Sequence, residues 1–146
     1  MKTDDEYYMR EALKEAVIAF EKEEVPVGSV IVGGNKIIAR AYNLTETLND
    51  VTAHAEMQAI TSAASYIGGK YLKECTLYVT LEPCLMCAGA LYWAQIARIV
   101  YGATDTKRGF SLNPSSPLHT TTTITSGILE TECAILMKDF FKKKRL

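Results

Sequence analysis

Two short segments constrain the fold of this chain more than any other feature of its sequence. Residues 52–56 read Thr-Ala-His-Ala-Glu and include His54, and residues 81–87 read Leu-Glu-Pro-Cys-Leu-Met-Cys and include Cys84 and Cys87. Histidine nitrogen and cysteine thiolate are ligands that zinc binds readily, and two cysteines separated by two residues have a spacing typical of zinc sites. We therefore expect the fold to bring these two distant segments together around a zinc ion.

The number of these ligands indicates which kind of zinc site to expect. A structural zinc ion is normally held by four protein ligands, whereas a catalytic zinc ion keeps one position for water. His54, Cys84 and Cys87 make three ligands. The sequence therefore predicts one catalytic zinc ion (Zn2+) per chain.

The residues around the two cysteines predict a helix that begins at this point. Pro83 suits the first position of a helix, where its missing N–H is not needed. Cys84 and Cys87 would then lie on one face of the first turn. The positive end of the helix dipole would favour the thiolate form that a metal requires.

A second helix is expected around His54, with Asp50 or Thr52 as its capping residue. Its apolar face is predicted to continue through Met57, Ile60 and Ala64. His54 and Glu56 are only two residues apart, so on a regular helix they would point to different sides. They can converge on one small volume only near the start of this helix, which is a geometric requirement of the hypothesis.

Each part of the motif has a simpler interpretation when it stands alone. A Cys-x-x-Cys pair could be a redox pair, a disulfide or two buried thiols, and a histidine at a helix start could be a cap or a core hydrogen-bonding residue. Glu56 alone would be a surface carboxylate. The combination of His-x-Glu with Pro-Cys-x-x-Cys is instead the signature of zinc-dependent nucleobase deaminases.

Composition places the chain among ordinary globular proteins. Its 146 residues, 48% of them hydrophobic and 23% charged, are expected to form one domain (residues 1–146). No apolar run reaches membrane-spanning length and the N-terminus does not resemble a secretion signal, so no membrane partner and a cytoplasmic location are expected. In that reducing setting, Cys75 and Cys133 are expected to be buried thiols and not a disulfide.

The pattern along the chain predicts a central sheet with helices on both faces. A first helix is expected to open at the capping box of residues 3–6 and to end near residues 23–24, with a buried stripe made of Met9, Leu13, Ala16, Val17 and Phe20. Strands are predicted at 28–32, 36–42, 76–81, 98–101 and 121–125, and further helices after residues 52 and 83 and at the C-terminus. This order favours an α/β fold with three layers, α/β/α, around a mixed five-stranded sheet. Ligands are expected beyond the carboxyl ends of strands, after Tyr42 and after Leu81.

The motifs and their surroundings resemble the cytidine deaminase-like superfamily and, within it, the bacterial tRNA-specific adenosine deaminases. The resemblance extends over nearly the whole chain. It runs through residues 24–28, Asn43, 52–56, 76–90, 102–105, 127–133 and 140–141. It implies a zinc site formed by His54, Cys84 and Cys87, and it implies that Glu56 carries protons during catalysis.

The resemblance also implies which residues bind substrate. Asn43 would hydrogen-bond the target base, and Asp105 and Lys107 would face the nucleotide and its backbone. Phe141, with Phe140 and the basic residues 142–145, would help to hold a tRNA anticodon loop. The simpler alternatives are a charged turn around Asp105 and two core phenylalanines. The resemblance further implies a homodimer whose sites use residues from both subunits.

Two segments depart from the tRNA enzymes. These enzymes often have His-Pro and Asn-His in the late loop, where this chain has Ser-Pro-Leu-His-Thr at residues 116–120. Tyr92-Trp93-Ala94 is closer to bacterial guanine deaminases. Both departures concern the choice of substrate and leave the zinc chemistry unchanged.

The predicted reaction is hydrolytic deamination of the wobble adenosine of tRNA to inosine. Zinc-bound hydroxide would attack C6 of adenine while Glu56 shuttles the protons. One alternative is a guanine deaminase or another free-base or nucleotide deaminase with the same zinc site. A second is a non-catalytic zinc module in which His119 supplies a fourth ligand.

Overall fold

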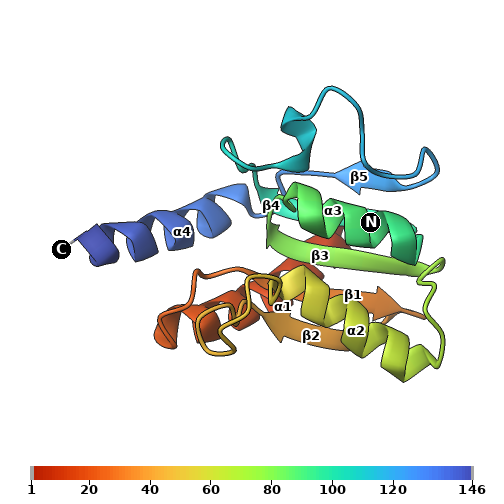
Figure 1. The fold of residues 1–146 in the computed structure, drawn as a ribbon, viewed down its shortest axis with the longest axis horizontal. Coiled ribbons are helices and arrows are strands. Elements are labelled where there is room, and N and C mark those ends of the chain that lie inside the picture. The colour runs from red at the N-terminus through yellow and green to blue at the C-terminus, as the bar shows by residue number, and fades with distance from the viewer. Residues whose placement is uncertain (1, 146) are drawn as a thin grey trace.

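The computed structural model describes residues 2–145, and its elements follow the order expected from the sequence (Figure 1). The helices are α1 (Lys2–Glu21), α2 (Ala55–Ile67), α3 (Leu85–Ala94), the short 3-10 helix η1 (Phe110–Leu112) and α4 (Glu130–Arg145). The strands are β1 (Gly28–Gly33), β2 (Lys36–Tyr42), β3 (Cys75–Leu81), β4 (Arg98–Ala103) and β5 (Thr123–Thr125). Each predicted helix and strand is present, with differences of a few residues at the ends.

The strands form one mixed sheet in the order β2-β1-β3-β4-β5. β1 is antiparallel to β2 and to β3, whereas β3, β4 and β5 are parallel. The β1–β2 hairpin turns at Gly34 and Asn35, which both have positive φ angles of 60° and 62°. Glycine and asparagine tolerate this left-handed conformation best, which explains why the chain reverses here.

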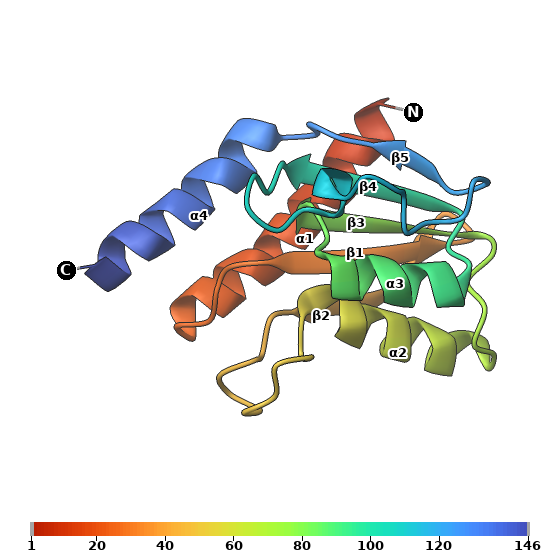
Figure 2. The ribbon, with the colours of Figure 1, turned by 45° about the horizontal axis from the view of Figure 1, so that its top comes forward.

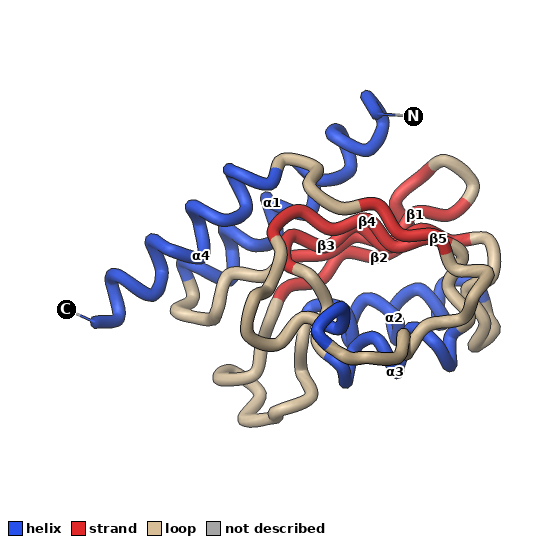
Figure 3. Tube along the Cα trace, turned by 90° about the horizontal axis from the view of Figure 1, so that it is seen from above, coloured by secondary structure: helices blue, strands red, loops and turns tan. Residues whose placement is uncertain are grey.

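Helices cover both faces of the sheet, as Figures 2 and 3 show. Val30 and Val32 of β1 pack with Met9 of α1 in one core, whereas Ile31, which lies between them, packs with Ala59 of α2 in the other. This alternation follows from the two-residue period of a strand. α1 and α4 thus form one outer layer and α2 and α3 the other, so the expected three-layer α/β/α fold is confirmed. Within the described residues, no helix is long and apolar enough to cross a membrane.

The first helix differs in two respects from the expectation. The described helix already includes Lys2, so the backbone of Thr3 lies inside it, and the capping role expected for the Thr3 side chain lies outside what the structure describes. Its fully buried stripe consists of Met9, Ala12, Ala16 and Ala19, whereas Val17 is 42% exposed. Small side chains are needed here because α1 approaches the sheet so closely that a Cβ atom at Gly28 would collide with the backbone of Ala12 and Ala16.

One edge of the sheet collects the loops that matter for function. Because β1 is antiparallel to both of its neighbours, β2 runs in the same direction as β3 and β4. The carboxyl ends of these three strands therefore lie at the same edge, where the chain continues into Asn43, Glu82 and Thr104. The C-terminal part of α4 projects beyond this edge (Figure 1).

Candidate metal site and cleft

His54, Cys84 and Cys87 come together where α2 and α3 begin. His54 is the N-cap of α2 (φ −70°, ψ 156°) and Cys84 is the N-cap of α3 (φ −76°, ψ 175°), both in extended backbone. Cys87 lies in the first turn of α3 and is fully buried. The expected meeting of the two distant segments is therefore present among the described residues.

The capping details differ from the sequence expectations. Asp50 and Thr52 do not cap α2; instead the Asp50 carboxylate accepts hydrogen bonds from the Thr52 N–H (2.8 Å) and hydroxyl (2.7 Å) in the preceding turn. Pro83 lies one residue before the N-cap and not at the first helical position. In both helices the cap position is occupied by a member of the metal cluster, which points its side chain past the helix end.

The buried face of α2 also differs from the predicted one. Ala55, Glu56, Ala59 and Ala63 are buried, whereas Met57, Ile60 and Ala64 are half-buried. The start of the helix explains the difference. Residues 55 and 56 face inwards at its first turn, and Ala59 and Ala63 follow them on the same face at helical spacing.

The distances between the three side chains fit a zinc ion. Nδ1 of His54 lies 3.4 Å from Sγ of Cys87 and 3.7 Å from Sγ of Cys84. A tetrahedral ion with Zn–N of about 2.05 Å and Zn–S of about 2.3 Å would place the nitrogen and sulfur about 3.6 Å apart. The three ligand atoms all lie within 4.8 Å of one another, so one ion can contact all of them.

The surroundings favour the ligand form of Cys84. The Cys87 thiol donates a hydrogen bond to Cys84, and together with the nearby His54 and the Cys87 backbone N–H it lowers the pKa of Cys84 to about 4 despite burial, while the same contact raises the pKa of Cys87. A pKa this low makes Cys84 a thiolate at neutral pH, which is the form that binds metal.

Glu56 occupies the first turn of α2 beside the cluster. It is only 4% exposed, and burial raises its pKa to about 7, because an ionised carboxylate is costly where solvent is excluded. His54 and Glu56 thus converge at the helix start, as the hypothesis required. A carboxyl group with a pKa near neutrality can both accept and donate a proton.

A cleft of about 960 Å³ opens over this cluster. It is lined by His54, Glu56 and Cys84, by parts of the segments 25–27, 43–45 and 103–108, and by one side of α4. The expected substrate residues Asn43, Asp105, Lys107 and Phe141 all lie in this lining. Lys144 and Arg145 of the expected basic residues 142–145 also lie in the lining, which further includes residues that the sequence did not point to, namely Thr45, Glu82, Arg108, Met137 and Lys138.

The polar residues of the lining are partly engaged within the protein. The Asn43 side chain donates to the Val25 carbonyl (3.2 Å) and accepts from the Thr45 N–H (3.3 Å). One oxygen of Asp105 accepts hydrogen bonds from the backbone N–H groups of Lys107 and Arg108, both at 3.0 Å. Asp105 therefore forms the charged turn considered above and lies on the cleft as well.

The rim of the cleft is cationic and partly aromatic. Exposed basic side chains approach it from the 104–108 segment and from α4, namely Lys107, Arg108, Lys138, Lys144 and Arg145. The two phenylalanines of α4 separate: Phe140 is buried and contacts Phe20, whereas Phe141 is 43% exposed and lies in the lining. Such a rim suits a polyanion with flat bases.

The late loop does not complete the metal site. The His119 ring stacks on Tyr92, with ring centroids 4.0 Å apart and an interplanar angle of 8°, and it is not part of the metal cluster. The alternative in which His119 is a fourth ligand is therefore wrong.

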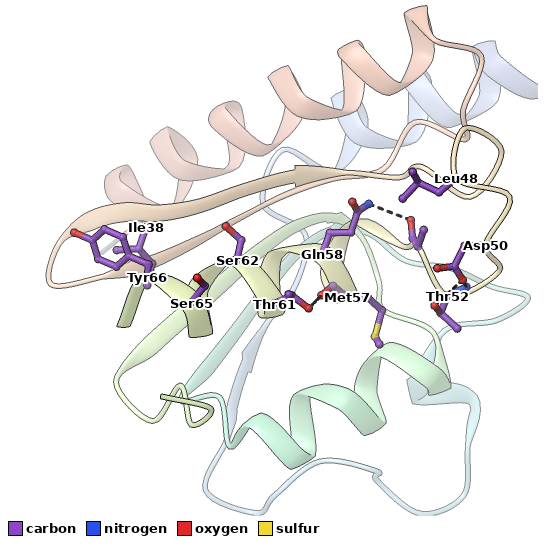
Figure 4. A pocket seen from close by; sticks show the side chains of 11 residues that line it. Ile38, Leu48, Asp50, Thr52, Met57, Gln58, Thr61, Ser62, Ser65 and Tyr66 are labelled. Atoms are coloured by element: carbon purple, nitrogen blue, oxygen red, sulfur yellow. Dashed lines mark hydrogen bonds between the residues drawn. The ribbon is translucent and has the colours of Figure 1, made fainter. Parts of the chain in front are cut away.

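A second pocket, of about 620 Å³, lies between β2 and the outer side of α2 (Figure 4). Its lining includes hydroxyl and amide side chains, namely Gln58, Thr61, Ser62 and Ser65, beside apolar ones such as Ile38 and Met57. It contains none of the three metal ligands, so the larger cleft is the place to look for chemistry.

Comparisons with known proteins agree with this geometry. Residues 2–103 match the family described as the cytidine and deoxycytidylate deaminase zinc-binding region. The chain is 46% identical to the tRNA-specific adenosine deaminase of Bacillus subtilis, over 98% of this chain and 92% of that protein. A solved structure from a study of A-to-I editing by tRNA:A34 deaminases is 44% identical, with a TM-score of 0.82 over 89% of this chain and 98% of the other. A guanine deaminase structure from Bacillus subtilis is 40% identical, with a TM-score of 0.66 over 69% of this chain and 65% of the other.

Proposed function

The chain belongs to the zinc-binding cytidine and deoxycytidylate deaminase family, within its tRNA-specific adenosine deaminases, and we propose that it hydrolyses the wobble adenosine of a tRNA anticodon loop to inosine. The observation that carries the proposal is the cleft itself, in which a three-ligand metal cluster and a buried carboxyl group lie beneath a cationic rim. A free base would need only the floor of this cleft. An RNA loop would use the floor for one base and the rim for its phosphates.

His54, Cys84 and Cys87 would hold the zinc ion, whose Lewis acidity makes a water molecule nucleophilic at neutral pH. Glu56 is the proton carrier. Its carboxylate takes a proton from the attacking water and delivers it to the ring nitrogen next to C6. The carboxylate then takes the remaining proton from the new C6 hydroxyl and gives it to the departing amino group, so that water and adenosine become ammonia and inosine. Burial of Glu56 suits both steps, because it brings the two protonation states close in energy.

Asn43 is proposed to hold the target base in place. One N–H of its side chain is bound to the Val25 carbonyl, and an amide nitrogen has a second N–H that can donate to the base. Because Asn43 is nearly buried and fixed from both ends, it can orient the base without loss of side-chain freedom.

The rim is proposed to hold the rest of the anticodon loop. Lys107 and Arg108 on one side and Lys138 on the other can contact phosphates, and the exposed ring of Phe141 offers a stacking surface for a flanking base. The face that binds RNA is therefore the local cationic rim, although the whole chain carries a formal charge of only −1.

Guanine deamination is the second candidate, supported by the 40% identical guanine deaminase and by Tyr92-Trp93 on α3. The same zinc site and Glu56 would serve it. Tyr92 is half-buried and stacked on His119, so it orders the late loop. Nothing in that contact requires a free base as substrate. A free base also has no phosphates that the cationic rim could bind.

One experiment separates the two candidates. Zinc-loaded protein is incubated with an anticodon stem-loop bearing adenosine at the wobble position, and in parallel with free guanine, cytosine and cytidine monophosphate. We expect inosine in the RNA and no ammonia from the small substrates, with RNA binding that weakens as salt rises. A stem-loop with the adenosine moved by one position is the matched control. Ammonia from guanine without inosine in the RNA would overturn the tRNA assignment.

A homodimer is also part of the proposal. The outer surface of α3 exposes apolar side chains such as Leu85 (53%) and Trp93 (76%), and Val51 (83%) is exposed in the loop before α2. Figure 4 shows Met57 of α2 pointing toward α3. A second copy of the chain would bury this surface by pairing it with itself around a twofold axis. We also place the protein in the cytoplasm, where its tRNA substrate is found and where its four free cysteines would stay reduced.

The dimer is tested by Trp93→Glu. Twofold symmetry would place two new charges in one interface, so the dimer dissociation constant is expected to rise at least about a hundredfold. Light scattering over a concentration series measures this change. Ile135→Glu is the matched control, because Ile135 is an exposed apolar residue (50%) as well but lies on α4 in the other layer. An unchanged dimer in the Trp93 variant, or equal dissociation in both, would contradict this interface.

A further inference from the structure

We propose that Glu24 and Glu82 are positioning residues, each of which fixes one wall of the cleft by accepting backbone hydrogen bonds from the loop that forms it. Neither carboxylate belongs to the metal cluster, and no step of the deamination uses them. Both are nevertheless buried, Glu24 at 0% and Glu82 at 2% exposure. The inference rests on the proposed function in one respect, namely that the two loops contact the substrate.

Glu82 fixes the wall formed by residues 104–111. One of its oxygens accepts a hydrogen bond from the backbone N–H of Asp105 (3.1 Å), and the other accepts one from Ser111 (3.0 Å). A single side chain thus holds both ends of this loop. Lys107 and Arg108, whose exposed side chains reach the cleft, lie between the two attachment points.

The same loop is joined to the segment that carries the metal ligands. The Phe110 N–H donates to the Pro83 carbonyl (2.9 Å), and Gly109 forms an isolated bridge with Cys84. A Cβ atom at position 109 would collide with the Glu82 carboxylate, so any side chain there would force that carboxylate to move. The loop therefore keeps a fixed distance from Cys84 as long as Glu82 remains in place.

Glu24 fixes the loop of residues 43–50, whose first residues form another wall of the cleft. It accepts hydrogen bonds from the backbone N–H of Glu46 (3.0 Å), the backbone N–H of Thr47 (2.6 Å) and the Thr47 hydroxyl (2.7 Å). Burial alone would raise the pKa of Glu24, but these hydrogen bonds outweigh it and hold the pKa below its usual range. Asn43 and Thr45, at the start of this loop, face the cleft.

A carboxylate suits this task better than any other side chain. It has two oxygens and only accepts hydrogen bonds, so it can pair with two or more N–H groups of a loop that has no regular structure. Glutamine keeps the length but replaces one oxygen with a donor, which leaves a donor facing a donor. A buried N–H without an acceptor is costly, so the loop is expected to open locally more often.

The two loops carry different protease sites, which allows each wall to be tested separately. Residues 104–111 contain Lys107 and Arg108 for trypsin and no glutamate, whereas residues 43–50 contain Glu46 for a glutamyl endopeptidase and no lysine or arginine. Glu82→Gln is expected to raise tryptic cleavage after residues 107 and 108 by about tenfold or more, and Glu24→Gln to raise cleavage after Glu46 similarly. Each variant should leave the other loop as resistant as in the unchanged protein.

A second variant reaches the same wall without altering the carboxylate. Gly109→Ala places a methyl group where the Glu82 carboxylate lies, so it should displace that carboxylate from Asp105 and Ser111. We expect it to reproduce the tryptic sensitivity of Glu82→Gln, and we expect the double variant to be no more sensitive than either single one. Additive effects would contradict a shared cause.

The consequence for catalysis should appear mainly in binding. With the wobble-adenosine stem-loop, Glu24→Gln and Glu82→Gln are each expected to raise KM by about fivefold or more while kcat falls less than KM rises, with one zinc ion retained per chain. Glu74→Gln, at an exposed position before β3, is the matched control and should change none of these quantities.

The outcomes separate this inference from the proposed function. The positioning roles would be overturned by unchanged cleavage in the matching loop or by loss of zinc. Increased cleavage of both loops in one variant would overturn them as well, because it indicates general destabilisation. Absence of inosine with the unchanged protein would instead overturn the proposed function, while the cleavage patterns would still report whether Glu24 and Glu82 hold their loops.

Discussion

Replacing Glu56 with glutamine is expected to lower the turnover of wobble adenosine by at least about a hundredfold, with the zinc ion still bound. Glutamine has nearly the same shape, so the buried position in the first turn of α2 remains filled. It cannot take a proton from water at neutral pH or return one to the amino group. The variant would still bind substrate and zinc, but it would lose the proton transfers that turnover requires.

Two measurements on the Glu56→Gln protein check this result. Single-turnover formation of inosine in the stem-loop gives the rate, and elemental analysis gives the zinc content. Glu74→Gln provides the same chemical change at an exposed position and is expected to leave both quantities unchanged. Turnover within a few-fold of the unchanged protein would remove Glu56 from its proposed role, and zinc loss would show that it supports the metal site instead.

The part of this site that could be predicted from the sequence is the part that depends on residue identity and spacing. His54, Cys84 and Cys87 are recognisable because few side chains bind zinc and their spacing is restricted. The requirement that Glu56 converge with His54 at a helix start also followed from helix geometry. The helix ends were less predictable, because Pro83 and Asp50 fit the statistics of capping positions, yet metal-cluster residues occupy both caps.

The walls of the cleft could not be predicted in the same way. Glu24 and Glu82 act on backbone N–H groups more than twenty residues away in sequence, and any residue can supply such a group. The only local signal is an acidic residue next to apolar neighbours, as Glu82 is between Leu81 and Pro83. Burying such a carboxylate costs free energy unless its oxygens accept hydrogen bonds. This cost could have marked Glu82 as a candidate for holding a loop.

Helix packing shows the same limit. The periodicity of α1 was correct, but it could not show that a close approach to Gly28 selects alanines over Val17 for the buried stripe. On α4, Phe140 and Phe141 are the same residue type and are adjacent in sequence. Only the position of α4 beyond the sheet edge decides that one fills the core and the other lines the cleft.

Replacing Cys87 with alanine is expected to abolish both the bound zinc and the activity. Cys87 supplies one of three ligand atoms, and its loss should cost more than the roughly 10–100-fold in affinity that changes to the outer partners of metal ligands cause. Elemental analysis after dialysis against a weak chelator measures the effect. Cys75→Ala is the matched control, since Cys75 is a free thiol of similar burial outside the cluster. Because His54 and Cys84 alone cannot hold a catalytic ion firmly, one zinc ion per chain in the Cys87 variant would mean that the metal is held elsewhere, and the deaminase mechanism would fail with it.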